Sequence, residues 1–319
     1  WKDIQTVAVN KEYPRTAFMT YDNRDQALTG EYENSPYYKL LNGTWNFYYA
    51  DTYKDLPANI EQPDANIAWK EIKVPGNWEV QGYGVAIYTN HGYEFKPRNP
   101  QPPQLPEANP VGVYQRDIEI PADWDGRDIF LRLEGAKSGV YVYVNGQEVG
   151  YSEDSKNPAE FLINNYLKPG KNSLVIKIFR WSTGSYLECQ DMFRLSGIFR
   201  NVSIFALPKV HIRDFFAQAN PVDQRDWALN IDHAKPGTVD GDWRLQVDVD
   251  VRNLFPATEK LDGCTVSMAL YDAAGKLVEP VKPKDAPYDG VLEKPLRITG
   301  MKDFKTSLLG IYSKPRLWS

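Results

Sequence analysis

Residues 181–200, WSTGSYLECQDMFRLSGIFR, combine aromatic, acidic, basic and glycine residues without a regular pattern. The stretch shows neither the alternation of a strand nor the apolar stripe of a helix. Glu188 and Asp191 lie three positions apart, with Gln190 between them. Carboxylates and amides can bond the hydroxyl pairs of a sugar while an aromatic ring packs under its apolar face.

Two interpretations of this stretch remain open from the residues alone. In the first it is a structured crossover that turns at Gly184 and Gly197, and its acids cap turns or pair with Arg194 and Arg200. In the second it is a rim loop that offers a carboxylate to a polyhydroxylated ligand or to a metal ion.

Motifs for other kinds of catalysis do not occur in the sequence. There is no G-x-S-x-G, P-loop, G-x-G-x-x-G or H-E-x-x-H pattern. Cys189 has no histidine near it in sequence, and we interpret it as a buried packing thiol. The histidines, at 91, 211 and 233, are too scattered for a zinc cluster. The sequence therefore predicts no catalytic residue in this chain.

Composition excludes some partners and leaves others open. The net charge is −5, with acids and bases interspersed, so no basic patch predicts nucleic acid binding. The longest apolar runs have the length of strands, well short of a membrane-spanning helix. Aromatic residues make up 13% of the chain, which fits a sandwich core or a sugar-binding surface. Cys189 and Cys264 fall in different predicted domains, so we expect no disulfide between them.

The elements that must position this stretch are short strands. At least seven such segments precede residue 208, with no long amphipathic helix, and Asn145-Gly146 predicts a hairpin turn. Residues 82–111 carry six prolines, which predicts a long, irregular and functional loop. We therefore predict an all-β fold, with a β-sandwich domain over residues 1–207.

Residues 208–319 form a second predicted domain. Strands about a dozen residues apart, and a second hairpin that turns on Gly275, predict an immunoglobulin-like sandwich. No terminating strand is visible before the end, so we expect this sandwich to be incomplete, with an open edge or disorder near 260–319.

The full segment RWSTGSYLECQDMFRLSGIFRNVSI closely resembles the corresponding segment of the glycoside hydrolase family 2 β-galactosidases. Five further motifs resemble this family in the same order along the chain, so the resemblance runs over nearly all of it. They are LNGTWNFYYA, VPGNWEVQGYGVAIYTNHGYEF, NPVGVYQRDIEIP, VYVNGQEVGYSEDSKNPAEFLI and KPRLWS.

The resemblance implies a domain order: a jelly-roll sugar-binding domain, similar to galactose-binding domains, then an immunoglobulin-like domain, then a TIM barrel with two catalytic glutamates. This chain would then be the part before the barrel, inactive alone, of an enzyme that hydrolyses terminal β-galactosyl residues by a retaining mechanism. The implied partners are β-galactosides, the enzyme's own barrel and possible further subunits of an oligomer. The compartment, bacterial cytoplasm or periplasm, stays open.

The resemblance also assigns roles to two residues. Asn90, in the Y-T-N motif, matches an asparagine that contacts the galactosyl unit. Asp191 matches an aspartate that contacts the sugar and ligates a monovalent cation together with barrel residues. The full-length enzyme would use sodium and magnesium.

Several positions depart from the family pattern. Phe193 replaces a usual tryptophan, and Val85-Ala86 change the loop shape. Thr183 replaces an aspartate of some members, which argues against a divalent metal site there. We interpret Glu148 and Glu153 as solvated.

Two alternatives to the enzyme-fragment hypothesis remain open. One is a free-standing carbohydrate-binding module, which should bind oligosaccharide alone. The other is a purely structural sandwich pair that supports oligomer contacts, which would leave Asn90 and Asp191 far apart and internally bonded.

Overall fold

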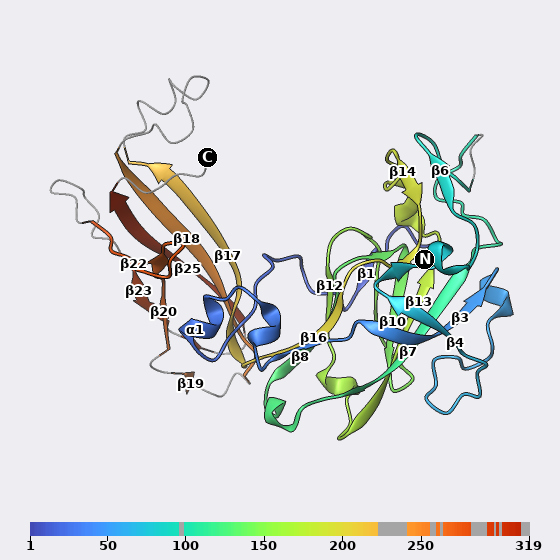
Figure 1. Ribbon diagram of the computed structural model, residues 1–319, viewed down its shortest axis with the longest axis horizontal. Coiled ribbons are helices and arrows are strands. Elements are labelled where there is room, and N and C mark those ends of the chain that lie inside the picture. Colours follow the sequence, from blue (N-terminus) through green and yellow to red (C-terminus); the bar gives the residue numbers. More distant parts are fainter. Residues whose placement is uncertain are drawn as a thin grey trace. The chain divides into compact units, whose positions relative to one another are not determined.

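The computed structural model describes residues 1–95, 99–222, 241–255, 260–261, 264–281, 292–296, 298–299 and 302–313. The chain divides into two compact units. The first comprises Trp1–Pro14 and Met19–Leu207, and the second comprises Arg15–Phe18 and Pro208–Ser319. Nearly all regular structure is antiparallel strand, which confirms the all-β prediction (Figure 1).

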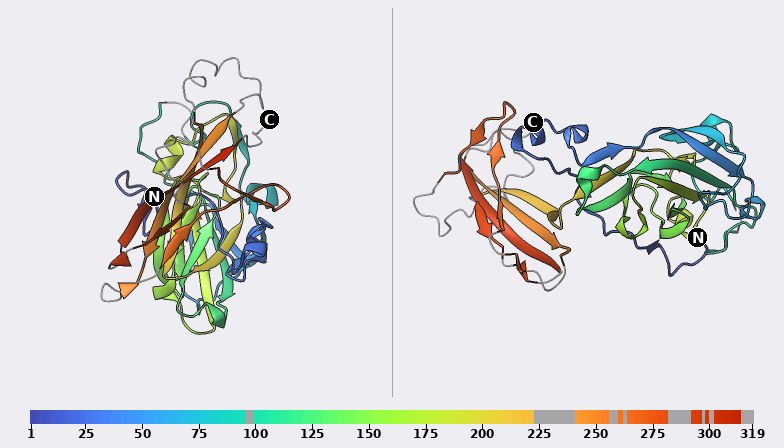
Figure 2. Two further views of the ribbon diagram at one scale, coloured as in Figure 1. Left: turned by 90° about the vertical axis from the view of Figure 1, so that its left-hand side faces the viewer. Right: turned by 90° about the horizontal axis from the view of Figure 1, so that it is seen from below.

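The first unit is a sandwich of two antiparallel sheets, seen as layers in Figure 2. Its larger sheet has the strand order β1 (Ala8–Val9), β11 (Gln147–Ser152), β10 (Gly139–Val144), β13 (Lys171–Phe179), β7 (Val111–Glu119), β3 (Gly43–Ala50) and β4 (Lys70–Val74). Its smaller sheet has the order β12 (Ala159–Leu162), β8 (Asp128–Leu133), β16 (Val202–Leu207) and β2 (Tyr38–Leu40).

Strand periodicity explains how the two sheets share one core. In β3, Trp45 and Phe47 are buried while Asn46 between them is exposed, because successive side chains of a strand point to opposite faces. By contrast, β8 and β16 are buried at every position. On the face away from the shared core, Phe130, Phe205 and Leu207 form a second cluster, against which Met19 and Tyr38 pack.

Local turn chemistry agrees with the sequence. Asn145 and Gly146 have φ angles of 51° and 79° between β10 and β11, as a tight hairpin requires. Short helical segments connect other strands. They are α1 (Arg24–Ala27) and the 3-10 turns η1 (Tyr32–Asn34), η2 (Tyr53–Asp55), η3 (Glu79–Gln81), η4 (Ala122–Trp124), η5 (Asn164–Tyr166) and η6 (Thr183–Tyr186). Among the described residues, no helix has the length and apolar character to cross a membrane.

Two small antiparallel assemblies in the first unit involve the segments that the sequence left irregular. One joins β6 (Ile87–Thr89) to β14 (Met192–Arg194), and the other has the order β5 (Gly76–Asn77), β15 (Gly197–Ile198) and β9 (Ala136–Lys137). The expectation that 82–111 and 181–200 contain no strand was therefore wrong. The hydrogen-bonding partner of each short strand lies far away in sequence, so no local pattern marks it.

The second unit is built on a three-stranded antiparallel sheet of β17 (Val210–Pro221), β18 (Asp242–Asn253) and β25 (Lys302–Ser313). Alternate residues of β18, including Val249 and Val251, form its core. Residues 15–18 belong to this unit, because the Thr16 amide donates to Asp214 Oδ1 at 2.9 Å. Shorter pairs are β19 (Lys260–Leu261) with β24 (Ile298–Thr299), β20 (Thr265–Ser267) with β23 (Glu293–Pro295), and β21 (Leu270–Tyr271) with β22 (Leu277–Val278).

Two sequence predictions about this unit have different outcomes. The hairpin at Gly275 is confirmed, since β21 pairs with β22 and the glycine has a φ angle of 75°. The incomplete edge near 260–319 stays a prediction, because much of that range, the KPRLWS motif included, lies outside the described residues.

Candidate functional site

The candidate site is the ribbon formed by β6 and β14 at one end of the first unit (Figure 1). Antiparallel pairing sets Met192 opposite Thr89 and Phe193 opposite Tyr88. Side chains alternate between the two faces of this ribbon. One face is exposed and carries four side chains: Tyr88, Asn90, Asp191 and Phe193.

Asn90 and Asp191 each lie one residue beyond the paired residues Thr89 and Met192. Paired Cα atoms are about 5.5 Å apart and consecutive ones 3.8 Å, so Asn90 and Asp191 are within about 13 Å of each other. This distance is compatible with one bound monosaccharide. The purely structural alternative required the two residues to be far apart and internally bonded. The first condition is not met, whereas the second is, since each side chain has a hydrogen bond within the chain.

Three of the four exposed side chains contact one another, and the fourth, Asn90, contacts its neighbour His91. The Tyr88 hydroxyl donates to Asp191 Oδ1 at 2.8 Å. The rings of Tyr88 and Phe193 have centroids 5.4 Å apart and are tilted by 55°. Asn90 Oδ1 lies 2.7 Å from His91 Nδ1. The face therefore combines a carboxylate and an amide, which can bond sugar hydroxyls, with two aromatic rings, which can pack against an apolar sugar face.

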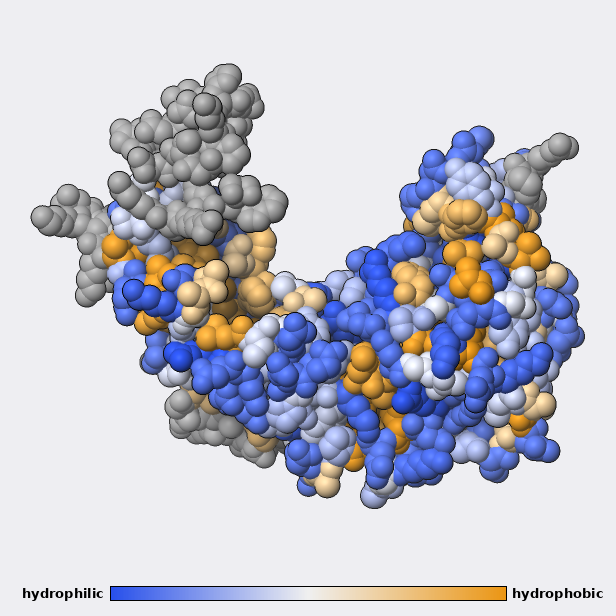
Figure 3. Space-filling view, in the orientation of Figure 1, coloured by the Kyte–Doolittle hydropathy of each residue, from blue (hydrophilic) through white to orange (hydrophobic). Residues whose placement is uncertain are grey.

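Electrostatics keep the Tyr88 hydroxyl protonated as a donor. The hydrogen bond to Asp191, followed by the charge of that carboxylate, raises the pKa of Tyr88 above its ordinary value. Figure 3 shows apolar and polar surface side by side at the tip of the first unit. Figure 1, in the same orientation, places β6 and β14 at this tip.

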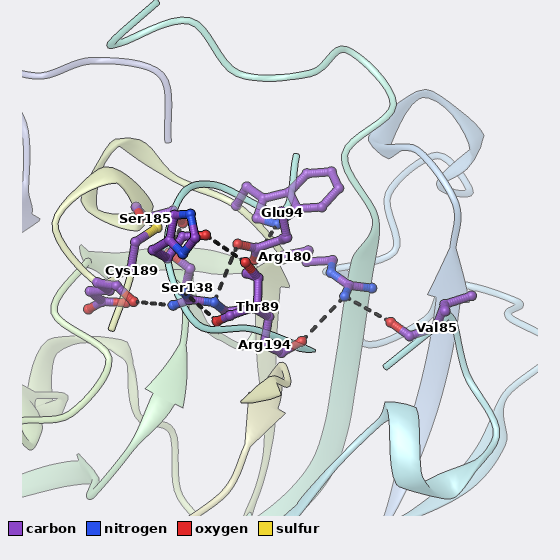
Figure 4. A network of polar contacts seen from close by, with 11 residues as sticks. Val85, Thr89, Glu94, Ser138, Arg180, Ser185, Cys189 and Arg194 are labelled. Carbon is purple, nitrogen blue, oxygen red and sulfur yellow. Dashed lines mark hydrogen bonds and ion pairs between the residues drawn. The ribbon is translucent and has the colours of Figure 1, made fainter. Parts of the chain in front are cut away.

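The inward face of the ribbon is held by Arg194, which is 1% exposed. Its guanidinium donates to the carbonyl oxygens of Glu188 at 3.0 Å and Thr89 at 3.3 Å (Figure 4). Its Nε lies 3.9 Å from the Glu94 carboxylate, which also accepts from the Trp181 indole at 3.0 Å. One buried cation thus joins the loop that contains β6 to the stretch that contains β14.

Arg180 makes a second connection between the same segments. It donates to the Val85 carbonyl at 2.9 Å and to the Arg194 carbonyl at 3.3 Å (Figure 4). The Glu79 carboxylate lies 3.7 Å from it and accepts from the Ser196 amide at 2.8 Å. Burial raises the pKa of Glu79, although these hydrogen bonds and the arginine oppose the rise.

The opening stretch has a structural role at some residues, and its role as a rim loop stays a prediction. Glu188 is structural, because it accepts from the Ser155 amide and hydroxyl, each at 2.6 Å. Arg200 also has a structural contact, with the Lys156 carbonyl. Asp191 instead lies on the exposed face of the ribbon. Sequence reasoning missed Tyr88 as a partner of Asp191, although it lies in the quoted Y-T-N motif.

Cys189 and Cys264 are both free, as predicted, and they belong to different units. Cys189 was predicted to be buried, whereas it is half-buried. The Cys189 thiol donates to the Ser185 carbonyl, and burial raises its pKa, so it is protonated near neutral pH.

Glu153 was predicted to be solvated, and that prediction was wrong. It is 3% exposed and accepts from the Tyr151 hydroxyl at 2.6 Å, the Thr183 hydroxyl at 2.9 Å and the Gly184 amide. The turn η6, distant in sequence, covers the end of β11 and buries it. Glu148, in β11, is exposed as predicted.

The contacts of Glu153 argue against a divalent ion beside Thr183. Hydrogen-bond donors point at the carboxylate oxygens that a metal would need. Among the described residues, no group of three or more His, Cys, Asp or Glu side chains is arranged to hold a metal. Asp191, with one oxygen bonded to Tyr88, can supply one ligand to an alkali cation. The sodium and magnesium of the full enzyme stay predictions.

Replacing Glu153 with glutamine should lower the free energy of unfolding of the first unit by about 1–3 kcal/mol, because an amide cannot accept from all three donors that surround this buried side chain. Urea denaturation measures this loss. The matched control is Glu148→Gln, an exposed position in β11, which should change little. Equal losses in the two variants, or marked stabilisation of the unmodified protein by Mg²⁺, would contradict a metal-free role for Glu153.

Known proteins resemble the chain in both sequence and fold. The family model described as glycosyl hydrolases family 2, sugar binding domain, matches residues 38–208. A β-galactosidase from Priestia megaterium is 34% identical over 268 residues, which cover 83% of this chain and 24% of that protein. A β-galactosidase from Actinobacillus pleuropneumoniae is 40% identical over 219 residues, which cover 68% of this chain and 21% of that protein. The chain thus spans about a quarter or less of the length of these relatives.

Solved structures share the fold at much lower identity. A β-glucuronidase from Bacteroides uniformis has a TM-score of 0.63 at 18% identity, covering 88% of this chain and 28% of that chain. A β-glucuronidase from Bifidobacterium dentium has a TM-score of 0.62 at 17% identity, and the match covers 95% of this chain and 45% of that chain. At this level of identity the likeness concerns the fold alone.

Proposed function

The chain belongs to glycosyl hydrolase family 2, and from that premise we propose that it is the N-terminal, non-catalytic part of a retaining β-galactosidase. The observation that carries this proposal is the exposed face of the β6–β14 ribbon, where Asn90 and Asp191 lie within reach of one sugar. In this proposal the first unit supplies the rim of a pocket whose two catalytic carboxylates come from a barrel outside this chain.

Each rim residue has a chemical task. The Asp191 carboxylate accepts a hydrogen bond from a galactosyl hydroxyl, directly or through a sodium ion that it helps to ligate. The Asn90 amide can accept from one hydroxyl and donate to another. Such contacts orient the sugar, and they speed the reaction only as far as they strengthen in the transition state.

The charge of Asp191 favours a galactoside over a glucuronide. A glucuronide carries its own carboxylate, and two like charges on one site repel each other. The sequence relatives quoted above are named β-galactosidases, whereas the glucuronidases resemble the chain in fold. Together these points support a neutral hexosyl substrate.

The test uses the complete gene product and p-nitrophenyl glycosides. We expect kcat/KM for the β-galactoside to exceed that for the β-glucuronide by about a hundredfold or more. Residues 1–319 alone should hydrolyse neither compound. A preference for the glucuronide would overturn the substrate assignment, and hydrolysis by residues 1–319 alone would overturn the non-catalytic role.

The exposed pair Tyr88 and Phe193 favours a second candidate, a self-sufficient carbohydrate-binding module. Such a module would bind galacto-oligosaccharides without the barrel. Calorimetric titration of residues 1–319 with a galacto-oligosaccharide distinguishes the two candidates. A dissociation constant in the millimolar range, or no binding, fits the rim of an incomplete pocket, and a micromolar dissociation constant fits a self-sufficient module.

A further inference from the structure

The hydroxyl of Tyr88 is the one side-chain donor that the structure shows on Asp191 within the described part of the chain. The two residues lie diagonally across the ribbon, since Asp191 is two positions from Phe193, the cross-strand partner of Tyr88. They share its exposed face, and Tyr88 is 57% exposed. A diagonal pair of this kind is within reach of a long aromatic side chain.

Three contacts restrict the position of Tyr88. Its backbone pairs with β14, and its ring lies against Phe193. The next residue, Thr89, gives its carbonyl to the buried Arg194. The hydroxyl therefore stands at a defined place on the ribbon, although the side chain is open to solvent.

A bound hydroxyl changes what Asp191 can offer to a ligand. A free aspartate on a surface rotates among several rotamers and presents either oxygen. With Oδ1 bonded to Tyr88, the rotation of the carboxylate is restricted and Oδ2 remains to meet a sugar hydroxyl or an alkali cation. Binding then requires less ordering of the side chain.

We propose that Tyr88 is a positioning residue, which fixes the Asp191 carboxylate in the orientation that binds the galactosyl unit. This inference rests on the proposed function, because it presumes that Asp191 contacts the sugar. Tyr88 acts through Asp191 and does not itself contact the reacting atoms. The raised pKa of its hydroxyl keeps the donor protonated across the neutral range.

The test replaces Tyr88 with phenylalanine in the complete gene product, which removes the hydroxyl and keeps the ring beside Phe193. We expect the dissociation constant for a non-hydrolysable thio-β-galactoside to rise about tenfold, the usual scale for lost outer-shell support. The melting temperature should stay within a degree or two. The matched control is Tyr186→Phe, which removes a nearby hydroxyl that donates to the Gln104 carbonyl and should leave binding unchanged.

A double-mutant cycle with Asp191→Asn shows whether Tyr88 acts through Asp191. If it does, Tyr88→Phe weakens binding in the parent enzyme and changes much less in the Asp191→Asn background. Two outcomes would overturn the positioning role alone. In one, Tyr88→Phe weakens binding equally in the parent and in the Asp191→Asn enzyme. In the other, Tyr88→Phe leaves binding unchanged while Asp191→Asn clearly weakens it. If Asp191→Asn itself leaves binding unchanged, the proposed sugar contact fails and the positioning role fails with it.

Discussion

Replacement of Asp191 with asparagine is expected to lower kcat/KM of the complete enzyme for β-galactosides by about a hundredfold. The change keeps the size of the side chain and an oxygen for the Tyr88 hydroxyl, and it removes the negative charge. Hydrogen bonds to a charged acceptor are roughly twice as strong as neutral ones, and they matter most where water is excluded. Steady-state kinetics on p-nitrophenyl β-galactoside measure the loss.

The separate changes in kcat and KM show whether the carboxylate binds the substrate and the transition state equally or binds the transition state more strongly. A contact that is equal in the ground and transition states raises KM alone, whereas one that strengthens during reaction also lowers kcat. The matched control is Asp64→Asn, which removes the same charge from another exposed position of the first unit. Similar kinetics in the two variants would show that Asp191 contributes only to the general negative potential.

The sequence predicted the sandwich well, because its signals are local. Runs of β-branched and aromatic residues marked the strands, and Asn145-Gly146 marked a turn that needs two positive φ angles. The resemblance to family 2 picked out Asn90 and Asp191. It did so without showing what brings them together.

The rest of the site depends on contacts that are distant in sequence. The partners Tyr88 and Phe193 are 105 residues apart, and Arg194 reaches the Thr89 carbonyl over the same separation. Local period gives no information about such pairings, so β6 was taken for irregular loop. The burial of Glu153 was missed for the same reason, since η6 covers it from 30 residues away.

Arg194→Met is expected to lower the free energy of unfolding of the first unit by about 3–5 kcal/mol, the scale for removing one partner of a buried ion pair. Methionine fills much of the space but cannot donate. The carbonyls of Thr89 and Glu188 would lose their side-chain donor. The Glu94 carboxylate, which is 3% exposed in its side chain, would lose the guanidinium charge 3.9 Å away. Urea denaturation measures the loss, and Arg200→Met on the same stretch, which breaks one exposed contact to the Lys156 carbonyl, is the control.

Arg194→Met should also weaken sugar binding by loosening the ribbon. Arg194 holds the inward face of the ribbon, and the outward face carries Asn90 and Asp191. Amide hydrogen exchange should speed up in Ile87–Thr89 and Met192–Arg194 more than in β3 or β13, as expected when local opening becomes easier. Arg194→Lys should recover part of the stability, since an ammonium keeps the charge without the planar fork that reaches several acceptors. If Arg194→Met unfolds no more readily than Arg200→Met and exchange at the ribbon is unchanged, the ribbon is held by its strand pairing and by Arg180. The preorganisation of the rim would then not depend on Arg194.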